Sequence, residues 1–301
     1  MVHVFLDGCV SSNRYCLRDQ PECYLYRSAY RKTMTASTRI ALKLAYTGDR
    51  YHGFQIQPNV CTVEYEVFSS LKKSGIVNDI REARYSRAAR TDRGVHAAGQ
   101  VIAFDTGTGF GDSLPRIVNS NLPDDIWVWA HAEVPDDFDP RRDAIRREYR
   151  YFLYNRGYDL TLMRESSHLF TGTHDFSNFT KEKGGTIRTI DKIDIHERNN
   201  LIVIDITAPS FLWNMVRRIA AALEEIGCRK RNQDWLLDML NPARHRQGIK
   251  PAPAYGLVLR NVVFEGIEWI EDEYSKRRME KAFMDAMVWH ATMKEVLYSG
   301  L

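Results

Sequence analysis

The stretch AARTDRGVHAAGQ, residues 88–100, contains an acidic side chain in a setting that suits catalysis. Asp92 stands between Arg90 and Arg93, and Gly94 follows. A carboxylate held beside cations can act as a nucleophile or can stabilise developing positive charge. Asp followed closely by Gly is also a common turn. The residue type alone therefore leaves a catalytic and a structural interpretation of Asp92 open.

Clustered arginines surround this stretch, although the whole chain is nearly neutral. The 42 basic and 39 acidic residues give a net charge of only +3. Arginine recurs at every third position from Arg84 to Arg93, and RRDAIRREYR (141–150) places further arginines close together. Such runs are also typical of a solvated face. They indicate a polyanionic partner, since clustering and not total charge would attract it.

Sequence signatures of cofactor and metal sites are missing. The chain has no G-x-x-x-x-G-K-[ST] phosphate loop, no G-x-S-x-G elbow and no C-x-x-C pair, and its histidines lack metal-ligand spacing. We therefore expect neither a cofactor nor a metal.

Strands and helices alternate along the chain. TRIALKLAY (38–46) places Ile40, Leu42 and Leu44 on one face, which is typical of a half-buried strand. Residues 62–75 have helical spacing and end at Gly75. Further strands are predicted at 100–105, 126–132, 149–155, 200–207 and 257–263, and further helices near 113–120, 173–180, 211–226, 233–241 and 273–297. This pattern predicts an α/β or α+β protein.

Composition and the positions of Pro and Asp suggest how the chain is divided into domains. Residues 1–33 have no clear periodicity and are predicted to be a poorly ordered extension. Pro and Asp cluster near 135–141, so we expect an N-terminal lobe over 34–138, a C-terminal lobe over 139–264 and a helical segment over 265–301. The five cysteines and the missing secretory signal predict a cytoplasmic protein, and no apolar run approaches the roughly 18–20 residues of a membrane span.

Six blocks in a fixed order carry a family resemblance. They are YTGDRYHGFQIQP (46–58), ARTDRGVHAAGQ (89–100), NSNLPDDIWV (119–128), REYRYFLYN (147–155), FLWNMVRRI (211–219) and PAPAYGLVL (251–259). Together they resemble the tRNA pseudouridine synthase A family over about residues 38–264. One departure is Ala89, where the family usually has Gly, but the acidic position is kept.

The resemblance implies a fold, an activity and partners. The implied fold is α+β, with two lobes of mixed, mainly antiparallel sheet backed by helices and the active cleft between them. The implied reaction is isomerisation of uridine to pseudouridine in the anticodon stem–loop of tRNA. It detaches uracil from ribose C1′ and rejoins it through C5, so nothing is added or removed overall. Family members usually form homodimers, and the tRNA contacts both subunits.

The resemblance also assigns residues. Asp92 is implied to be the catalytic nucleophile and Arg217 its charge partner, which would offset the cost of burying a carboxylate. Tyr149 would stack on the target base, Leu257 would form an apolar wall, and Arg90 would help displace the nucleotide. Candidates for phosphate contacts are Arg87, Arg93, Arg141, Arg142, Arg146 and Arg147.

Two other functions remain open at this point. One is a catalytically silent RNA-binding protein on the same scaffold, which the set of Asp92, Tyr149 and Arg217 argues against. The other is a hydrolytic nucleosidase or glycosidase, which usually needs a second carboxylate near the first. GVHAAGQ supplies none, although a residue distant in sequence could.

Overall fold

A mixed β-sheet organises the residues that the computed structural model describes, which are 37–107, 110–244 and 247–300. Its strands are β1 (Thr38–Tyr46), β2 (Ser86–Arg87), β3 (His96–Thr106), β4 (Ile126–Glu133), β5 (Arg146–Tyr154), β8 (Lys192–Arg198), β9 (Leu201–Ala208), β10 (Leu257–Val263) and β11 (Ile270–Glu271). Their order is β11-β4-β1-β3-β10-β5-β9-β8, and β2 pairs with β3. A separate hairpin pairs β6 (Gly172–Asp175) with β7 (Ile187–Ile190).

The pairing of β3 with β10 joins the two halves of the sheet. It is parallel and short, with Val258 opposite His96 and Leu259 opposite Ala97, whereas the other pairs of the sheet are antiparallel. This junction sets the N-terminal end of β3 beside β10, and β10 in turn pairs with β5. The Asp92 loop, which directly precedes β3, is therefore brought to strands that follow it by more than fifty residues in sequence.

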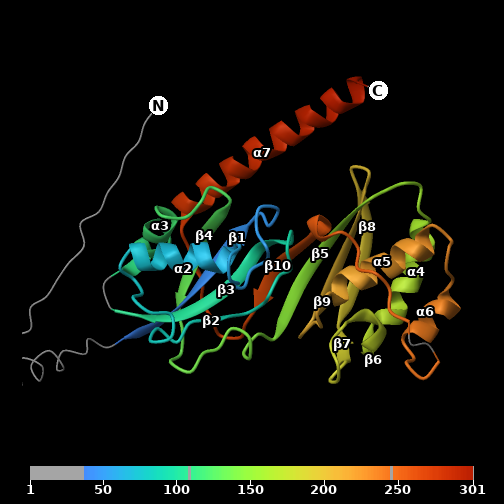
Figure 1. Cartoon of the computed structure of the whole chain (residues 1–301), viewed down its shortest axis with the longest axis horizontal. Helices are drawn as coiled ribbons and strands as arrows, with labels where there is room; N and C mark the ends of the chain where they lie inside the picture. The colour runs from blue at the N-terminus through green and yellow to red at the C-terminus, as the bar shows by residue number, and fades with distance from the viewer. Residues whose placement is uncertain (1–36, 108–109, 245–246, 301) are drawn as a thin grey trace, which may run out of the picture. The chain divides into compact units, whose positions relative to one another are not determined.

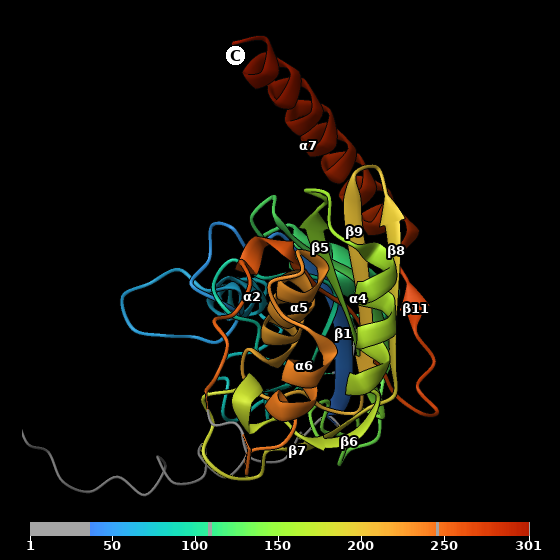
Figure 2. The same ribbon diagram turned by 90° about the vertical axis from the view of Figure 1, so that its right-hand side faces the viewer.

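Helices back the sheet. They are α2 (Val63–Lys73), α3 (Leu114–Asn119), α4 (Leu160–Ser167), α5 (Met215–Gly227), α6 (Gln233–Met239) and α7 (Glu273–Ser299), with 3₁₀ turns at Gly111–Ser113, His168–Phe170, Ser177–Phe179 and Ala254–Gly256. Figure 1 shows α2 over the β1 half and α5 over the β9 half, and Figure 2 places both helices on the same side of the sheet.

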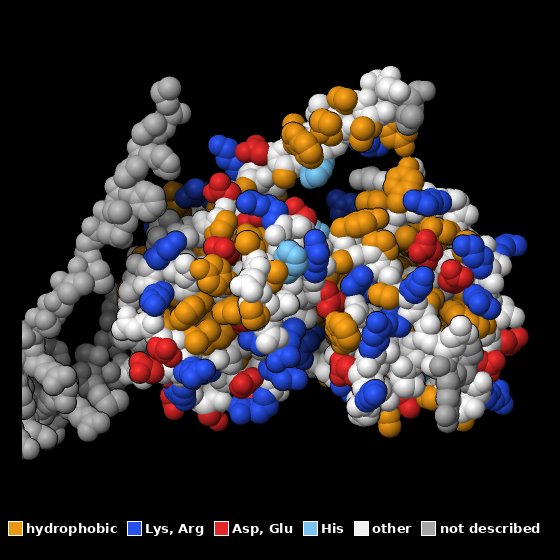
Figure 3. All heavy atoms as spheres, viewed as in Figure 1, with side chains coloured by type: hydrophobic (Ala, Val, Ile, Leu, Met, Phe, Trp, Pro, Cys, Tyr) orange, Lys and Arg blue, Asp and Glu red, His pale blue; other side chains and the backbone are white. Residues whose placement is uncertain are grey.

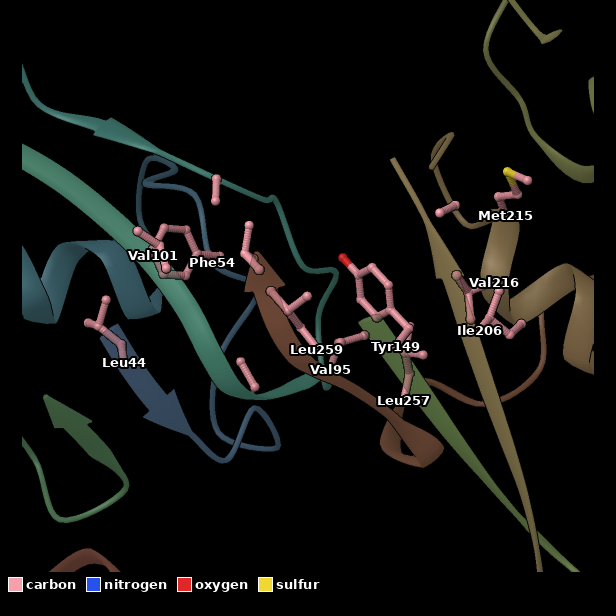
Figure 4. Close-up of a cluster of buried hydrophobic side chains, with 14 of the residues drawn as sticks. Leu44, Phe54, Val95, Val101, Tyr149, Ile206, Met215, Val216, Leu257 and Leu259 are labelled. Carbon is pink, nitrogen blue, oxygen red and sulfur yellow. The ribbon is translucent and has the colours of Figure 1, made fainter. Parts of the chain in front are cut away.

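A continuous apolar core lies between these helices and the sheet. Leu42 and Leu44 on β1 and Val101 on β3 are fully buried. Ala41 and Ala45, on the other face of β1, are buried as well, so the prediction that this strand is half-buried is wrong. Figure 4 shows this cluster running from Leu44 and Phe54 past Tyr149 to Ile206 and Met215. The predicted α+β fold, with a mixed, mainly antiparallel sheet backed by helices, is confirmed.

Several predicted elements differ from the observed ones. The helix predicted near 173–180 is wrong, because 172–175 form β6 and 177–179 a 3₁₀ turn. Phe176 and Phe179 have helical spacing, but both are buried as parts of an aromatic cluster with Phe170. Strands β7 and β8 and helix α4 were not predicted, although Ile193 and Ile195 alternate as strand residues do.

The two ends of the chain have different outcomes. The extension predicted over 1–33 lies outside the described residues. The predicted C-terminal helix exists as α7, whose first turns pack on α3 and β4 through buried Ser275. Within the described ranges, no helix combines the length and apolar character needed to cross a membrane. The lobe boundary at 138/139 stays a prediction.

Candidate active site

The Asp92 loop is fixed by its backbone. Val95 N–H donates to the carbonyl of Asp92 (3.1 Å), and Phe54 N–H donates to the carbonyl of Thr91 (3.0 Å). Gly53, with φ of +102°, allows this close approach, since a Cβ there would lie 2.9 Å from the Thr91 oxygen. The loop is thus braced against the segment that follows β1.

Asp92 and Arg217 form an ion pair, although 125 positions separate them. Arg217 Nη1 lies 3.2 Å from Asp92 Oδ2, with the two side chains 15% and 24% exposed. Arg217 also donates from Nε to the carbonyl of Ala252 (2.7 Å) and from Nη1 to Asn214 Oδ1 (2.8 Å). The guanidinium is therefore held in place before any ligand binds, which preorganises positive charge beside the carboxylate.

A left-handed residue sets the start of α5. Asn214, at the N-cap, has φ of 61° and ψ of 8°, a conformation that Asn tolerates better than most residues. The helix predicted from 211 therefore begins at Met215, and residues 211–214 form a turn that lines the cleft. This turn places Trp213 so that its indole Nε1 donates to Asp92 Oδ1 at 2.9 Å.

Tyr149 and Leu257 lie together on neighbouring strands. Tyr149 on β5 pairs with Leu259 on β10, and Leu257 is the first residue of β10. Tyr149 and Leu257, which were predicted to contact the target base, are both buried. Figure 4 shows Tyr149 beside Leu257 and Val95 in the middle of the apolar cluster. The ring of Tyr149 packs edge-on against Phe211, with centroids 5.1 Å apart. Burial raises the pKa of Tyr149 to about 12, so its hydroxyl is neutral at ordinary pH.

A cleft of about 900 Å³ connects these groups. It brings together nine of the eleven residues singled out in the sequence: Arg87, Arg90, Asp92, Arg93, Arg141, Arg147, Tyr149, Arg217 and Leu257. Seven arginines and three acidic residues line it, so the cleft is strongly basic in a nearly neutral chain. Figure 3 shows Lys and Arg side chains gathered near the middle of the viewed face.

The predicted phosphate-binding arginines have different surroundings. Arg147 is buried, and its guanidinium donates to the carbonyls of Ala88, Pro209 and Arg141. Arg87 forms an ion pair with buried Glu64 at 2.5 Å. Arg90, Arg93 and Arg141 are exposed at the cleft.

Two of the predicted arginines lie outside the cleft lining. Arg142 pairs with its neighbour Asp143 at 2.7 Å, and Arg146 lies 3.5 Å from Glu148.

Sequence reasoning missed several residues of the cleft. Trp213 and Phe211 lie inside the FLWNMVRRI block, but they were treated as part of a helix and not as cleft residues. Glu182 and Arg188 come from the segment around β7, where no element was predicted. Their positions in the cleft follow from the tertiary structure, and no local sequence pattern indicates them. No group of three or more His, Cys, Asp or Glu in the described ranges is arranged to hold a metal ion.

Comparison with known proteins decides the family. Residues 167–265 match the family model described as tRNA pseudouridine synthase. A Methanosarcina mazei protein named tRNA pseudouridine synthase A is 52% identical over 262 residues, which cover 86% of this chain and 97% of that protein. The chain belongs to the tRNA pseudouridine synthase A family. The Methanosarcina barkeri protein of the same name is also 52% identical, with the same coverage.

One solved structure, of the archaeal box H/ACA sRNP Nop10–Cbf5 complex, aligns with a TM-score of 0.30 and 12% identity over 62% of this chain and 44% of that chain. That score is too low to support any statement about fold or function.

As a tRNA pseudouridine synthase, the protein is an isomerase that converts uridine in tRNA to pseudouridine. The resemblance first seen in six sequence blocks is confirmed. A silent RNA-binding protein and a hydrolytic nucleosidase are set aside as descriptions of this chain.

Proposed function

We propose that this enzyme isomerises uridine in the anticodon stem–loop of tRNA. The open, arginine-lined cleft supports this assignment, because a loop nucleotide can be extruded into it at low cost. We place the reaction in the cytoplasm, with tRNA as the substrate; the two described cysteines, Cys61 and Cys228, are both unpaired. Mapping pseudouridine by mass spectrometry in tRNA from cells lacking the protein tests the position. Loss confined to sites outside the anticodon stem–loop would contradict it.

Asp92 is the nucleophile in this proposal, and the observation that carries it is the Asp92–Arg217 pair inside the basic cleft. A carboxylate oxygen bonds to ribose C1′ as the bond between C1′ and uracil N1 breaks, and it leaves when uracil C5 bonds to C1′. C5 then loses its proton and N1 gains one, so the product is an isomer of the substrate. Arg217 is held in place by its own contacts, so a fixed positive charge faces the carboxylate before it bonds to C1′ and again when it leaves.

The remaining cleft residues bind the extruded nucleotide. Tyr149 presents a neutral aromatic ring on which uracil stacks, and Leu257 closes the apolar side of the same pocket. Arg90 occupies the space that the nucleotide leaves in its stack. Exposed Arg93 and Arg141 contact phosphates, whereas the buried guanidinium of Arg147 fixes the backbone of the loop before Asp92.

Replacing Asp92 tests the catalytic assignment. Asp92→Asn should abolish pseudouridine formation on an unmodified tRNA transcript while RNA binding stays tight, because the change spares the phosphate contacts. Asp124→Asn is a matched control, since Asp124 is exposed and does not line the cleft. Near wild-type turnover by Asp92→Asn would exclude Asp92 as the nucleophile.

We also propose that two copies pair through α7. Figures 1 and 2 show α7 leaving the body of the protein after its first turns, and Figure 3 shows apolar side chains on its projecting part. Phe283, Met287, Trp289 and Leu297 are all exposed there. An exposed apolar surface of this extent is costly in water, so a partner surface that covers it would be stabilising.

The spacing on α7 supports a second α7 as that partner. Positions Met279, Phe283, Ala286, His290, Met293 and Leu297 follow one another at alternating steps of four and three, which is the seam of a two-helix coiled coil. In an antiparallel pair centred at Val288, Phe283 of one helix faces Met293 of the other. The flanking Glu280 then faces Lys294, so the stripe is complementary to itself in both apolar character and charge.

Molecular mass in solution tests this pairing. The wild-type protein should sediment as a dimer, and Phe283→Glu should make it a monomer by placing a charge in the seam. Lys281→Glu, on the polar side of the same helix, should leave the dimer intact. A wild-type monomer, or a Phe283→Glu dimer, would contradict pairing through α7.

A further inference from the structure

Both carboxylate oxygens of Asp92 accept hydrogen bonds from other side chains of the cleft. Oδ1 accepts the indole N–H of Trp213 at 2.9 Å, and Oδ2 accepts from Arg217 at 3.2 Å. The two donors belong to one short stretch of chain at the start of α5. Because the carboxylate is fixed at both ends, its orientation is set before the nucleotide arrives.

The two donors differ in how firmly they are held. The guanidinium of Arg217 is mostly buried and has two further acceptors, the Ala252 carbonyl and Asn214 Oδ1. Trp213 is 52% exposed and is anchored through its backbone. The backbone N–H of Trp213 donates to Glu182 Oε1 at 2.5 Å, and the backbone carbonyl of Trp213 accepts from Thr180 Oγ1 at 3.1 Å. The indole can therefore turn away from Asp92 while the backbone of residue 213 stays in place.

The chemistry of indole limits what Trp213 can do. Its Nε1–H is a donor and cannot accept a proton at ordinary pH, so Trp213 cannot be a general base. A donor on Oδ1 holds that oxygen in one direction, and it also competes with any group that approaches the same oxygen. Trp213 can therefore orient Asp92 and must give way to the nucleotide.

We propose that Trp213 is a positioning residue that orients Asp92 in the empty enzyme and releases Oδ1 when the target uridine enters. This inference rests on the proposed role of Asp92 as the nucleophile. On release, the half-exposed ring lies at the entrance of a cleft that accepts single-stranded nucleotides, where an aromatic face can stack on a neighbouring base. The hydrogen bond thus acts before the chemical step and is exchanged for substrate contacts during binding.

A split between kcat and KM distinguishes this role from a structural one. Trp213→Phe removes the N–H but keeps an aromatic ring, so Asp92 loses one of its two donors. We expect KM to fall about ten-fold, because the substrate no longer has to displace a hydrogen bond to a charged group. The value of kcat should stay close to that of the wild type, since this bond is already broken in the bound complex. Trp213→Gln restores an N–H donor four bonds from Cα, as in Trp, and should return KM toward the wild-type value.

The experiment measures tritium release from 5-tritiated uridine in an unmodified tRNA transcript for the full-length variants. Trp235→Phe is the matched control, because Trp235 lies outside the cleft lining. Urea unfolding of each variant reports whether it folds. An unchanged or raised KM for Trp213→Phe, a fall in its kcat, or a Trp213→Gln enzyme with the same KM as Trp213→Phe would overturn the inference.

Failure of the inference and failure of the proposed function give different results. An active Asp92→Asn enzyme would remove the nucleophile assignment, whatever Trp213 does. An inactive Asp92→Asn enzyme together with a Trp213→Phe enzyme whose KM matches that of the wild type would remove only the positioning role of Trp213.

Discussion

The residues around Asp92 contribute to the site in different ways. Gly53 permits the close approach that fixes the loop, Arg217 supplies a fixed charge, and Tyr149 supplies a buried ring. None of these residues is unusual in type. What makes them a site is that each side chain is held by a second contact, such as that of Arg217 with the Ala252 carbonyl or of Tyr149 with Phe211. Preorganised groups of this kind act without having to be rearranged during reaction.

Burial of Tyr149 has a consequence for stability at alkaline pH. Its pKa is raised to about 12, because burial disfavours the phenolate. The unfolded chain releases this proton near pH 10, so the stability that Tyr149 contributes is present below pH 10 and is lost as pH rises toward about 12. Tyr149→Phe should therefore lose about 2 kcal/mol less unfolding free energy than wild type between about pH 9 and about pH 11.5.

Urea unfolding across that pH range measures the effect of Tyr149. Tyr65→Phe is the control, because Tyr65 is exposed and its variant should follow the wild-type pH dependence. Parallel curves for Tyr149→Phe and wild type would show that the Tyr149 hydroxyl does not respond to its burial in this way.

At the scale of elements, the parallel β3–β10 pair is the joint on which the site depends. The Asp92 loop leads into β3, and Leu257 is the first residue of β10. Strand β10 also pairs with β5, where Leu259 lies opposite Tyr149. Two residue pairs join β3 to β10, so the backbones of these two strands have to stay in close contact. Gly99 provides it, since a Cβ there would lie 2.6 Å from the carbonyl oxygen of Arg260.

Gly99→Ala should separate the two strands. The added methyl group meets backbone and not the end of a flexible side chain, so the free energy of unfolding should fall by about 1–3 kcal/mol. Gly107→Ala, just beyond the end of the same strand, meets no atom within 4 Å and should have little effect. Urea denaturation compares them, and equal stability of Gly99→Ala and wild type would show that the joint tolerates the wider spacing.

At the scale of the whole molecule, charge is distributed very unevenly. The chain carries a net charge of only +3, yet the cleft has four more basic than acidic residues. A polyanion is therefore drawn to one region and not to the protein in general, because at physiological salt the attraction fades over about 8 Å. Neighbouring Arg141 and Arg142 illustrate the difference, since Arg141 lines the cleft and Arg142 is paired with Asp143.

Salt dependence of tRNA binding separates these two arginines. Each phosphate contact that is lost should lower the slope of log Kd against log salt by about 0.7–1. Arg141→Gln should show this change and bind several-fold more weakly at low salt, whereas Arg142→Gln should match wild type. Binding isotherms at several salt concentrations measure both, and equal slopes for the two variants would argue against a phosphate contact at Arg141.

The sequence by itself determined the family, the positions of six strands and the acidic residue at the centre of the cleft. These follow from local patterns: alternation in TRIALKLAY, and six motif blocks in order. Arg217 lies on the side of α5 opposite its buried apolar residues, and helical spacing alone allows that side to face either a cleft or open solvent. The tertiary structure decided that Arg217 faces the cleft. It also gave Trp213 and Arg188 their places and removed the helix expected near 173–180. The reason is physical: periodicity records which face of an element is buried, but contacts between residues distant in sequence depend on how the strands pair.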